Sequence, residues 1–197
     1  MSLTFIAPCV PTLVQSPPMG SSWLHEPKLD GWRLQIVKSG GLVGLLSRRG
    51  NDIAGRLPVL SQRLARLKGD FRLDAELLPV AGSFWWIARS IAEEAVVLGA
   101  FDLLQLGDND TRSMPVTERK RRLTAFVARA RLPELFTVPH FDDGAALLAE
   151  AETRGLEGIV SKRRGASYRS GRRPEWVKVK TVAWREANRE RWRKFAR

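Results

Sequence analysis

The sequence has almost no cysteine and no long apolar run, and both absences exclude classes of protein. Cys9 is the single cysteine among 197 residues, so no disulfide can form within the chain, and no set of Cys and His side chains has zinc-ligand spacing. No apolar run reaches the roughly 18 residues that a membrane-spanning helix needs. The first 14 residues lack a basic region and are interrupted by Pro8 and Pro11, so we expect no export signal and no membrane anchor. These features favour a cytoplasmic protein.

The remaining composition is that of a folded protein whose charge is unevenly distributed. With 44% hydrophobic residues, the chain is long enough for one sizeable domain with a buried core. Residues 1–160 carry 19 Lys and Arg against 18 Asp and Glu, whereas residues 161–197 carry 14 against 3. A nearly neutral body with one cationic end favours a polyanionic partner, with nucleic acid as the first candidate. A solvated basic tail is the alternative.

The hydrophobic pattern predicts an α+β fold. Alternating apolar residues over residues 31–38, followed by the turn SGG, predict a β-hairpin with residues 42–47. Leucines at intervals of three and four predict a helix over residues 56–67. Further strands are predicted at 71–80, 96–106, 158–163 and 175–180, and further helices at 117–130 and 142–155. Because strands and helices do not alternate regularly, antiparallel sheets flanked by helices are favoured over a doubly wound parallel sheet.

The ends of two helices and the C-terminal tail give local expectations. Thr117 is the predicted cap of the helix at 117–130, and Asp142 or Asp143 that of the helix at 142–155. After Lys180 the charge rises and the apolar alternation stops, so we expect a domain at 1–180 and a basic tail at 181–197. A helical tail would bring together three aromatic side chains, those of Trp184, Trp192 and Phe195.

Lysine is scarce beside arginine, which makes the remaining lysines informative. The chain has 25 Arg and 8 Lys. A lysine amine can lose its proton and act as a nucleophile, whereas a guanidinium stays charged. Half of the lysines lie in six short motifs, namely Lys28, Lys162, Lys178 and Lys180.

Those motifs, in chain order, resemble the ATP-dependent DNA ligases of the covalent nucleotidyltransferase superfamily. They are EPKLDGWR (26–33), SRRGND (47–52), LDAE (73–76), FDLL (101–104), EGIVSKR (157–163) and EWVKVK (175–180). The chain is most similar to the ligase module of bacterial ligase D, an end-joining repair enzyme, over about residues 5 to 180. The resemblance implies an ATP-grasp-like nucleotidyltransferase fold, with ATP and Mg²⁺ as cofactors.

The resemblance also implies a lysine nucleophile. Lys28 matches the lysine that attacks the α-phosphate of ATP, releases pyrophosphate and becomes lysyl-AMP, and Asp30 matches the residue that shapes the turn beside it. The attacking amine must be neutral, so burial or nearby cations are expected to lower the pKa of Lys28. Lys178 and Lys180 share one face of a strand at a separation of about 6.6 Å, from where both ammonium groups would stabilise the transferring phosphoryl group. An edge strand protected by charges is the alternative for this pair.

Further positions match nucleotide, metal and DNA contacts of the family. The implied nucleotide-binding residues are Glu26 at the adenine edge, Phe101 stacked on the purine, Arg33 and Arg48 on the ribose or a 5′-phosphate, and Glu76, Glu157 and Lys162. Glu76 and Glu157 are also the implied Mg²⁺ ligands, because hard carboxylate oxygens suit this ion. The arginines expected to contact DNA are Arg48, Arg163, Arg164, Arg172 and Arg173.

Two departures from the family pattern are visible. The third motif has Ala75 where glycine is usual, and the chain ends 17 residues after the VKVK motif, without the OB-fold domain that clamps the duplex in relatives. The initiating Met1 and the charged ending favour a natural stand-alone protein over a fragment. A partner that supplies an OB domain, a Ku-like end binder or a polymerase would then complete the function.

These observations predict an ATP-dependent adenylyltransferase of the DNA ligase type in a bacterial, nucleoid-associated setting. It would form lysyl-AMP, transfer AMP to the 5′-phosphate of a nick or break in duplex DNA, and promote sealing during repair. Two alternatives remain. One is an RNA ligase or capping-type nucleotidyltransferase with the same lysine chemistry, and the other is a non-catalytic DNA-end-binding module.

Overall fold

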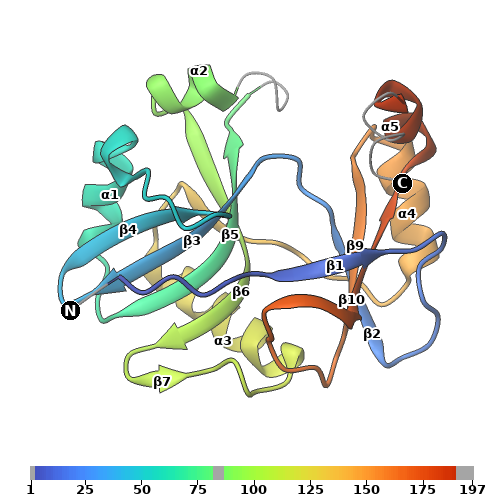
Figure 1. Ribbon diagram of the computed structural model, residues 1–197, viewed down its shortest axis with the longest axis horizontal. Coiled ribbons are helices and arrows are strands. Elements are labelled where there is room, and N and C mark those ends of the chain that lie inside the picture. The colour runs from blue at the N-terminus through green and yellow to red at the C-terminus, as the bar shows by residue number, and fades with distance from the viewer. Residues whose placement is uncertain (1–2, 82–86, 190–197) are drawn as a thin grey trace. The chain divides into compact units, whose positions relative to one another are not determined.

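The computed structural model describes residues 3–81 and 87–189 and divides the chain into two compact units rather than one continuous core (Figure 1). Unit 1 comprises Met1–Cys9, Asp30–Val138 and Gly165–Gly171, and unit 2 comprises Val10–Leu29, Pro139–Arg164 and Arg172–Arg197. Each unit is built from segments far apart in the sequence, so residues of one unit meet only after the chain has passed through the other.

Unit 1 contains a six-stranded sheet. Its strands are β3 (Trp32–Ser39), β4 (Leu42–Ser47), β5 (Phe71–Pro79), β6 (Val96–Leu106), β7 (Asn109–Asp110) and β8 (Leu135–Thr137). The order is β4-β3-β5-β6-β7, with β8 beside β6. The neighbours are antiparallel except for β6 and β8, and the predicted hairpin is the pair β3 and β4.

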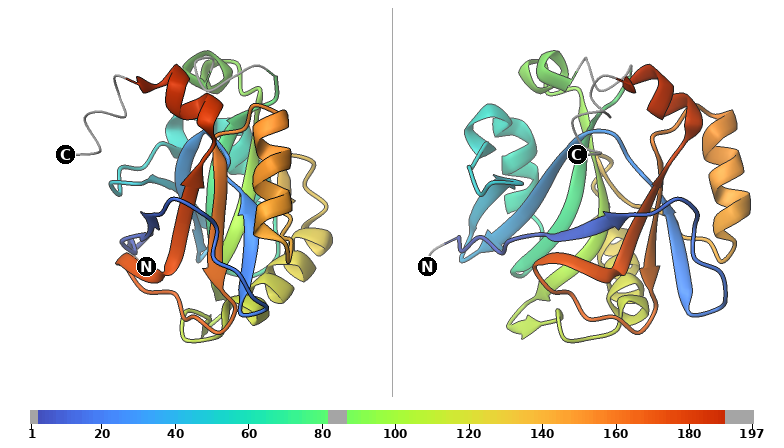
Figure 2. Two further views of the ribbon diagram at one scale, coloured as in Figure 1. Left: turned by 90° about the vertical axis from the view of Figure 1, so that its right-hand side faces the viewer. Right: turned by 45° about the vertical axis from the view of Figure 1, so that its right-hand side comes forward.

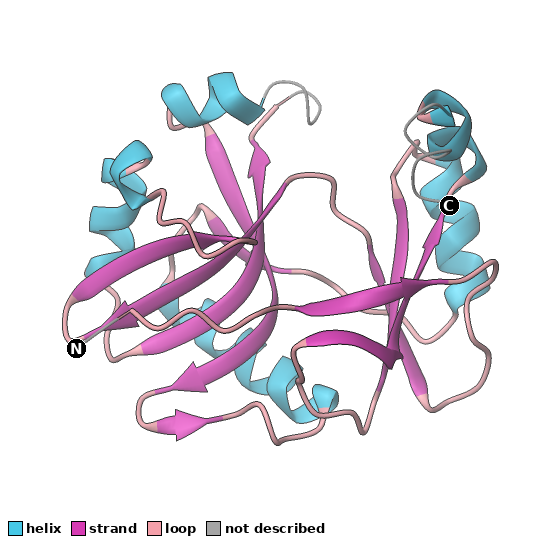
Figure 3. Cartoon of the chain, in the orientation of Figure 1, coloured by secondary structure: helices cyan, strands magenta, loops and turns pink. Residues whose placement is uncertain are grey.

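The helices of unit 1 bury one face of this sheet (Figure 3). They are η1 (Ala54–Arg56), α1 (Pro58–Ala65), α2 (Ile87–Ala92) and α3 (Val116–Ala130). The predicted leucine stripe buries Leu60 and Leu64 of α1, and α3 contributes Leu123 and Phe126 to the same core. Because side chains alternate along a strand, β5 directs Leu73, Ala75 and Leu77 into this core and its polar residues to the opposite face.

Unit 2 contains a four-stranded sheet with one helix packed on it (Figure 2). The strand order is β1-β10-β9-β2. The strands are β1 (Cys9–Leu13), β2 (Trp23–Pro27), β9 (Gly158–Arg163) and β10 (Gly171–Lys180). The helix α4 (Gly144–Thr153) lies against β9 and β2, where Leu147 and Ala151 pack with Ile159 and Val179. The short helix α5 (Val182–Ala187) follows β10.

The observed fold has the predicted α+β composition with antiparallel sheets, and it corrects one local expectation. Asp143 caps α4 as predicted, because its Oδ1 accepts hydrogen bonds from the amides of Ala145 and Ala146 at 2.9 Å. Thr117 as the cap of α3 is wrong. The N-cap is Pro115, whose extended backbone begins the helix one residue earlier without a side-chain hydrogen bond.

In the tail, Val182–Ala187 form the helix α5. Three aromatic residues of the tail were predicted to form one stripe. Trp184 lies within α5, whereas Trp192 and Phe195 lie outside the described residues. No helix within residues 3–81 and 87–189 is long and apolar enough to cross a membrane.

Candidate active site

Lys28 lies at the end of β2 in unit 2, and its backbone is fixed by the neighbouring strand. The amide of Lys28 donates to the carbonyl oxygen of Gly158 at 2.8 Å, which continues the β2 and β9 pairing by one residue. A side chain at position 158 would collide with this arrangement, since a Cβ there would lie 2.0 Å from the carbonyl oxygen of Val179. The glycine between Glu157 and Ile159 therefore lets three strands approach closely beside Lys28.

The strand alternation of unit 2 gathers charged groups on the sheet face opposite α4. On β10, Val177 and Val179 are buried and Val179 packs with α4, so Lys178 and Lys180 share the other face, as predicted. The register pairs Lys178 with Val160 and Lys180 with Gly158 of β9. The two strands thus present a row of lysines next to the end of β2.

Glu157 joins two of these lysines. Its Oε2 accepts from Nζ of Lys28 at 2.5 Å, and its Oε1 is paired with Nζ of Lys180. Glu157 and Lys180 are nearly buried, with exposed side-chain fractions of 6% and 7%, whereas Lys28 keeps 22%. The indole of Trp184 covers the ammonium group of Lys180, with Nζ 3.8 Å from the ring centroid. Lys28 is accordingly the most exposed member of a fixed cluster.

A second ion pair lies on the same face. Nζ of Lys162 is 2.7 Å from Oε2 of Glu26, and both side chains are at most 3% exposed. Lys162 also lies 4.2 Å from the ring centroid of Trp176. A buried ion pair of this kind holds both side chains in place, because a side chain that moved away would leave a buried charge without compensation. Glu26 is therefore held in one position two residues before Lys28.

Unit 1 holds a separate polar cluster around Asp74, on the sheet face opposite its core. Arg33 donates from Nε to Oδ1 of Asp74 at 2.9 Å and from Nη2 to Oδ2 at 2.6 Å. Its Nη1 donates to the carbonyl oxygen of Cys9 at 2.7 Å. Tyr168 donates its hydroxyl to Oδ2 of Asp74 at 2.7 Å and accepts from the amide of Cys9 at 3.1 Å. Phe101 completes the cluster, with its ring centroid 5.3 Å from the guanidinium carbon of Arg33.

The electrostatics of this cluster favour an ionised Arg33 and a neutral Tyr168. Burial alone would lower the pKa of Arg33, but the charge and hydrogen bonds of Asp74 outweigh it and raise this pKa above its ordinary value. Burial and then Asp74 raise the pKa of Tyr168. These three hydrogen bonds involve all three nitrogens of the Arg33 guanidinium but only three of its five N–H groups, so the side chain is held in place and keeps donor capacity for a ligand.

Glu76 is placed by the same strand and by the start of β3. Its Oε1 accepts from the amide of Gly31 at 3.1 Å. A Cβ at position 31 would lie 2.2 Å from the carbonyl oxygen of Leu77, so close packing of the backbone explains the glycine that follows Asp30. Asp30 itself is exposed and begins the second segment of unit 1.

The predicted DNA-binding arginines differ in their exposure and in their contacts within the protein. Arg48 is exposed in the turn after β4, and Arg163 and Arg172 are exposed in unit 2. Arg173 is half-buried. Arg164 is held inside unit 2, because it pairs with Asp142 and donates from Nε to the carbonyl oxygen of Ser21 at 2.9 Å.

Sequence reasoning did not assign roles to four residues that the structure places in these clusters. They are Asp74 and Tyr168 in unit 1 and Trp176 and Trp184 in unit 2. Asp74 and Trp176 lie within the recognised motifs, and their strand positions relative to Glu76 and Lys178 placed them on the same faces. Tyr168 had no such signal, since its partner lies 94 residues away in the sequence.

The described residues contain no group of three or more His, Cys, Asp or Glu side chains that would enclose a metal ion. Mg²⁺ does not need such a group, because it is usually held by one or two carboxylates together with substrate phosphates and water. Glu157 in unit 2 and Glu76 in unit 1 each offer such a single carboxylate.

Comparison with known proteins identifies the chain's relatives. A family model described as the ATP dependent DNA ligase domain matches residues 14–180. A multifunctional non-homologous end joining protein LigD from Pseudomonas aeruginosa is 38% identical over 186 residues, which cover 89% of this chain and 22% of that protein. A probable DNA ligase from Streptomyces avermitilis is 37% identical, over 80% of this chain and 35% of the relative. The chain thus spans about a fifth to a third of the length of these relatives.

Solved structures agree with the fold. The ligase domain of Mycobacterium tuberculosis LigD superposes with a TM-score of 0.76 at 31% identity, covering 88% of this chain and 59% of that one. A mycobacterial DNA ligase D complexed with ATP and MES superposes with a TM-score of 0.75, also at 31% identity, over 88% of this chain and 60% of that one. The predicted nucleotidyltransferase fold is therefore confirmed.

Proposed function

The chain belongs to the ATP-dependent DNA ligase domain family, and on this premise we propose that it adenylates Lys28 with ATP and passes AMP to a 5′-phosphate of DNA. One observation supports this above all others. Lys28 is the most exposed member of a cluster with Glu157 and Lys180, at the end of β2, and the strands β9 and β10 of the same sheet present further lysines on the same face. Fixed cations of this kind stabilise charge that develops on a transferring phosphoryl group.

In the first step, the lone pair of Lys28 Nζ attacks the α-phosphorus of ATP. The new N–P bond forms as the bond from the α-phosphorus to the bridging oxygen breaks, so pyrophosphate leaves and Lys28 carries AMP. The ammonium group of Lys28 loses one proton to solvent before the attack, and the nitrogen loses a second proton to solvent as the N–P bond forms. Lys178 and Lys180 would offset the negative charge of the phosphates, and Asp30 would shape the turn that follows Lys28.

The remaining candidates of each unit would bind the nucleotide. In unit 2, the fixed carboxylate of Glu26 would accept from the adenine edge, with Lys162 holding it in place. In unit 1, Phe101 offers an aromatic face for the purine, and Arg33 and Glu76 offer polar groups for the ribose. Mg²⁺ would neutralise phosphate charge, and Glu157 and Glu76 are the carboxylates that the resemblance assigns to it.

The later steps require duplex DNA with a nick or break. Lysyl-AMP would pass its AMP to the 5′-phosphate, and the adjacent 3′-hydroxyl would then displace AMP to form the phosphodiester bond. Arg48, Arg163, Arg172 and Arg173 would hold backbone phosphates, with Arg164 in a supporting position. A partner that supplies an OB domain, a Ku-like end binder or a polymerase would complete sealing, in the cytoplasm near the nucleoid.

The test is transfer of labelled AMP. Wild type, Lys28→Ala and Lys68→Ala would each be incubated with ATP labelled at the α-phosphate and Mg²⁺, separated on a denaturing gel, and then mixed with a nicked duplex. Lys68 is an exposed lysine outside the motifs and serves as the matched control. We expect label on wild type and Lys68→Ala, no label on Lys28→Ala, and movement of label from protein to the DNA 5′ end.

The alternatives are outcomes of the same experiment. Labelling by GTP in preference to ATP, or transfer only to nicked RNA, would indicate a capping-type enzyme or an RNA ligase. If wild type takes no label after pyrophosphate treatment to remove bound AMP, the chain does not self-adenylate, and binding of DNA ends without turnover remains.

A further inference from the structure

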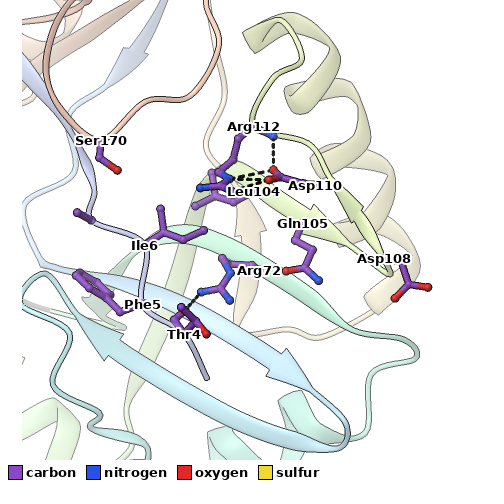
Figure 4. Close-up of a pocket in the computed structure, with 11 residues that line it drawn as sticks. Thr4, Phe5, Ile6, Arg72, Leu104, Gln105, Asp108, Asp110, Arg112 and Ser170 are labelled. Atoms are coloured by element: carbon purple, nitrogen blue, oxygen red, sulfur yellow. Dashed lines mark hydrogen bonds and ion pairs between the residues drawn. The ribbon is translucent and has the colours of Figure 1, made fainter. Parts of the chain in front are cut away.

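A pocket in unit 1 is lined by the N-terminal segment, by Arg72 near the start of β5 and by residues of β6 and β7, and neither Arg33, Asp74 nor Tyr168 is among its lining residues (Figure 4). Its volume is about 540 Å³, and its polar lining comes mainly from Arg72, Gln105, Asp108, Asp110, Arg112 and Ser170. Arg72, Asp74 and Glu76 alternate along β5 and share one face of the sheet. Arg72 is nearest the beginning of the strand, whereas Glu76 lies toward its other end.

Arg72 is the buried cation of this pocket, with only 7% of its surface exposed. Its Nη1 donates to Oε1 of Gln35 at 2.7 Å and to the carbonyl oxygen of Thr4, which are both uncharged acceptors. Nε of Arg72 is buried and has no hydrogen-bond partner among residues 3–81 and 87–189. Burial, reinforced by the nearby charge of Arg112, lowers the pKa of Arg72.

Two other arginines of unit 1 differ from Arg72, because each makes two hydrogen bonds to a carboxylate. Arg33 and Arg119 each donate from Nε and Nη2 to the two oxygens of one aspartate, Asp74 and Asp102 respectively. In both cases the carboxylate raises the pKa of the arginine despite burial. Arg72 is also largely buried, but no hydrogen bond from its Nε to a carboxylate is found among the described residues, and a buried charge without such a partner destabilises the protein.

We propose that the pocket binds a small oxyanion, either a phosphate group or a carboxylate, through the Nε and Nη2 edge of Arg72. Such a ligand supplies the two oxygens that Asp74 supplies to Arg33 and Asp102 to Arg119. At the rim, Arg112 is paired with Asp110 through Nε and Nη2, so these two charges compensate each other (Figure 4). Asp108 remains as an exposed carboxylate, and its repulsion favours a small anion over a polyanion such as DNA.

The Nε–Hε signal of Arg72 reports directly on this edge. The full chain, labelled with ¹⁵N-arginine, would be titrated with inorganic phosphate and separately with acetate at constant ionic strength. The Arg72→Gln variant identifies the signal by its loss. We expect a saturable shift of the Arg72 signal with at least one of the two anions, and the anion that is effective at lower concentration shows whether phosphate or carboxylate is preferred.

A second variant keeps the test independent of whether Arg72→Gln folds. Asp108→Asn removes an exposed rim charge, so calorimetric titration should show about two- to fivefold tighter binding of the same anion than to wild type. Three results overturn the proposal. They are a shift of the Arg72 signal that sodium chloride reproduces, a shift caused by duplex DNA and by neither small anion, and an affinity that Asp108→Asn leaves unchanged.

Discussion

At the scale of single residues, Tyr168 offers a direct test of the cluster around Asp74, because it is the only tyrosine in the chain and its ionisation can be followed alone. Its hydroxyl is buried against Asp74, and burial first and Asp74 second raise its pKa above the ordinary value of 10.0. We expect folded protein to show no tyrosinate absorbance in the ultraviolet just above pH 10, although the unfolded chain ionises there. Unfolded protein then binds fewer protons than folded protein, so the free energy of unfolding is unaffected below pH 10 and falls by about 1.4 kcal/mol per pH unit above it.

The matched variant is Tyr168→Phe. At neutral pH it should lower the free energy of unfolding by about 1 to 2 kcal/mol, because Asp74 and the amide of Cys9 each lose a buried hydrogen-bond partner. Above pH 10 it should lose less stability than wild type, since no phenol remains to ionise on unfolding. Urea titrations of both proteins at the two pH values measure this difference. A tyrosinate signal that rises near pH 10 in folded wild type contradicts the prediction.

The residues of the candidate site were predictable to different degrees. Lys28, Lys178 and Lys180 could be selected because their motifs resemble those of the DNA ligases, and strand alternation added only that Lys178 and Lys180 share a face. The structure places Lys28 and Lys180 on one carboxylate. The contact of Tyr168 with Asp74 could not be predicted, because it joins segments 94 residues apart and depends on the tertiary packing of unit 1. A local pattern fixes which face a side chain occupies, and only tertiary packing decides what it meets.

At the scale of elements, the start of β9 depends on a glycine. Gly158 has φ +149 and pairs with Lys180 across the strands, and a Cβ there would lie 2.0 Å from the carbonyl oxygen of Val179. Gly158→Ala should therefore lower the free energy of unfolding by at least about 2 kcal/mol and reduce self-adenylation, because Lys28 and Glu157 flank this pairing. Gly165→Ala is the matched control, since nothing lies within 4 Å of its added Cβ, and it should stay within about 0.5 kcal/mol of wild type. Equal stabilities of the two variants, measured by urea unfolding, would refute this account.

Elements with a strong local pattern were predicted, and short ones were not. The strands β3, β5 and β6 and the helices α1, α3 and α4 coincide with predicted segments. β8 has three residues and exists by pairing with β6, whose partner residues lie more than 30 positions earlier in the sequence. The cap of α3 was misplaced because Thr117 satisfies the usual preference while Pro115 already fixes the backbone at the helix start.

At the scale of the whole molecule, the charge could be predicted more easily than the division into units. The basic excess of residues 161–197 is a property of composition alone. Unit 2, by contrast, is assembled from three segments separated by stretches of unit 1, and its core joins α4 to β9 and β10. No periodicity within one segment reveals such a core, because its apolar faces are completed by strands far away in sequence.

The exposed arginines of unit 2 predict how the proposed binding to DNA depends on salt. Each phosphate neutralised by the protein releases counterions, so the logarithm of the binding constant falls with the logarithm of salt concentration by about 0.9 per contact. Arg163 is exposed, whereas the neighbouring Arg164 is engaged with Asp142 and with the carbonyl oxygen of Ser21. Arg163→Gln should therefore reduce the magnitude of this slope by about 0.9, and Arg164→Gln should reduce it by clearly less.

Fluorescence anisotropy of a labelled nicked duplex over a series of salt concentrations measures both slopes. The two variants lose the same formal charge at adjacent positions, so a difference between them reports contact with phosphate rather than net charge. A third variant, Asp142→Asn, should raise the contribution of Arg164, because it removes the carboxylate that holds this guanidinium. If Arg163→Gln and Arg164→Gln change the slope equally, the excess charge acts as a diffuse field, and the exposure of individual arginines does not determine which of them meet DNA.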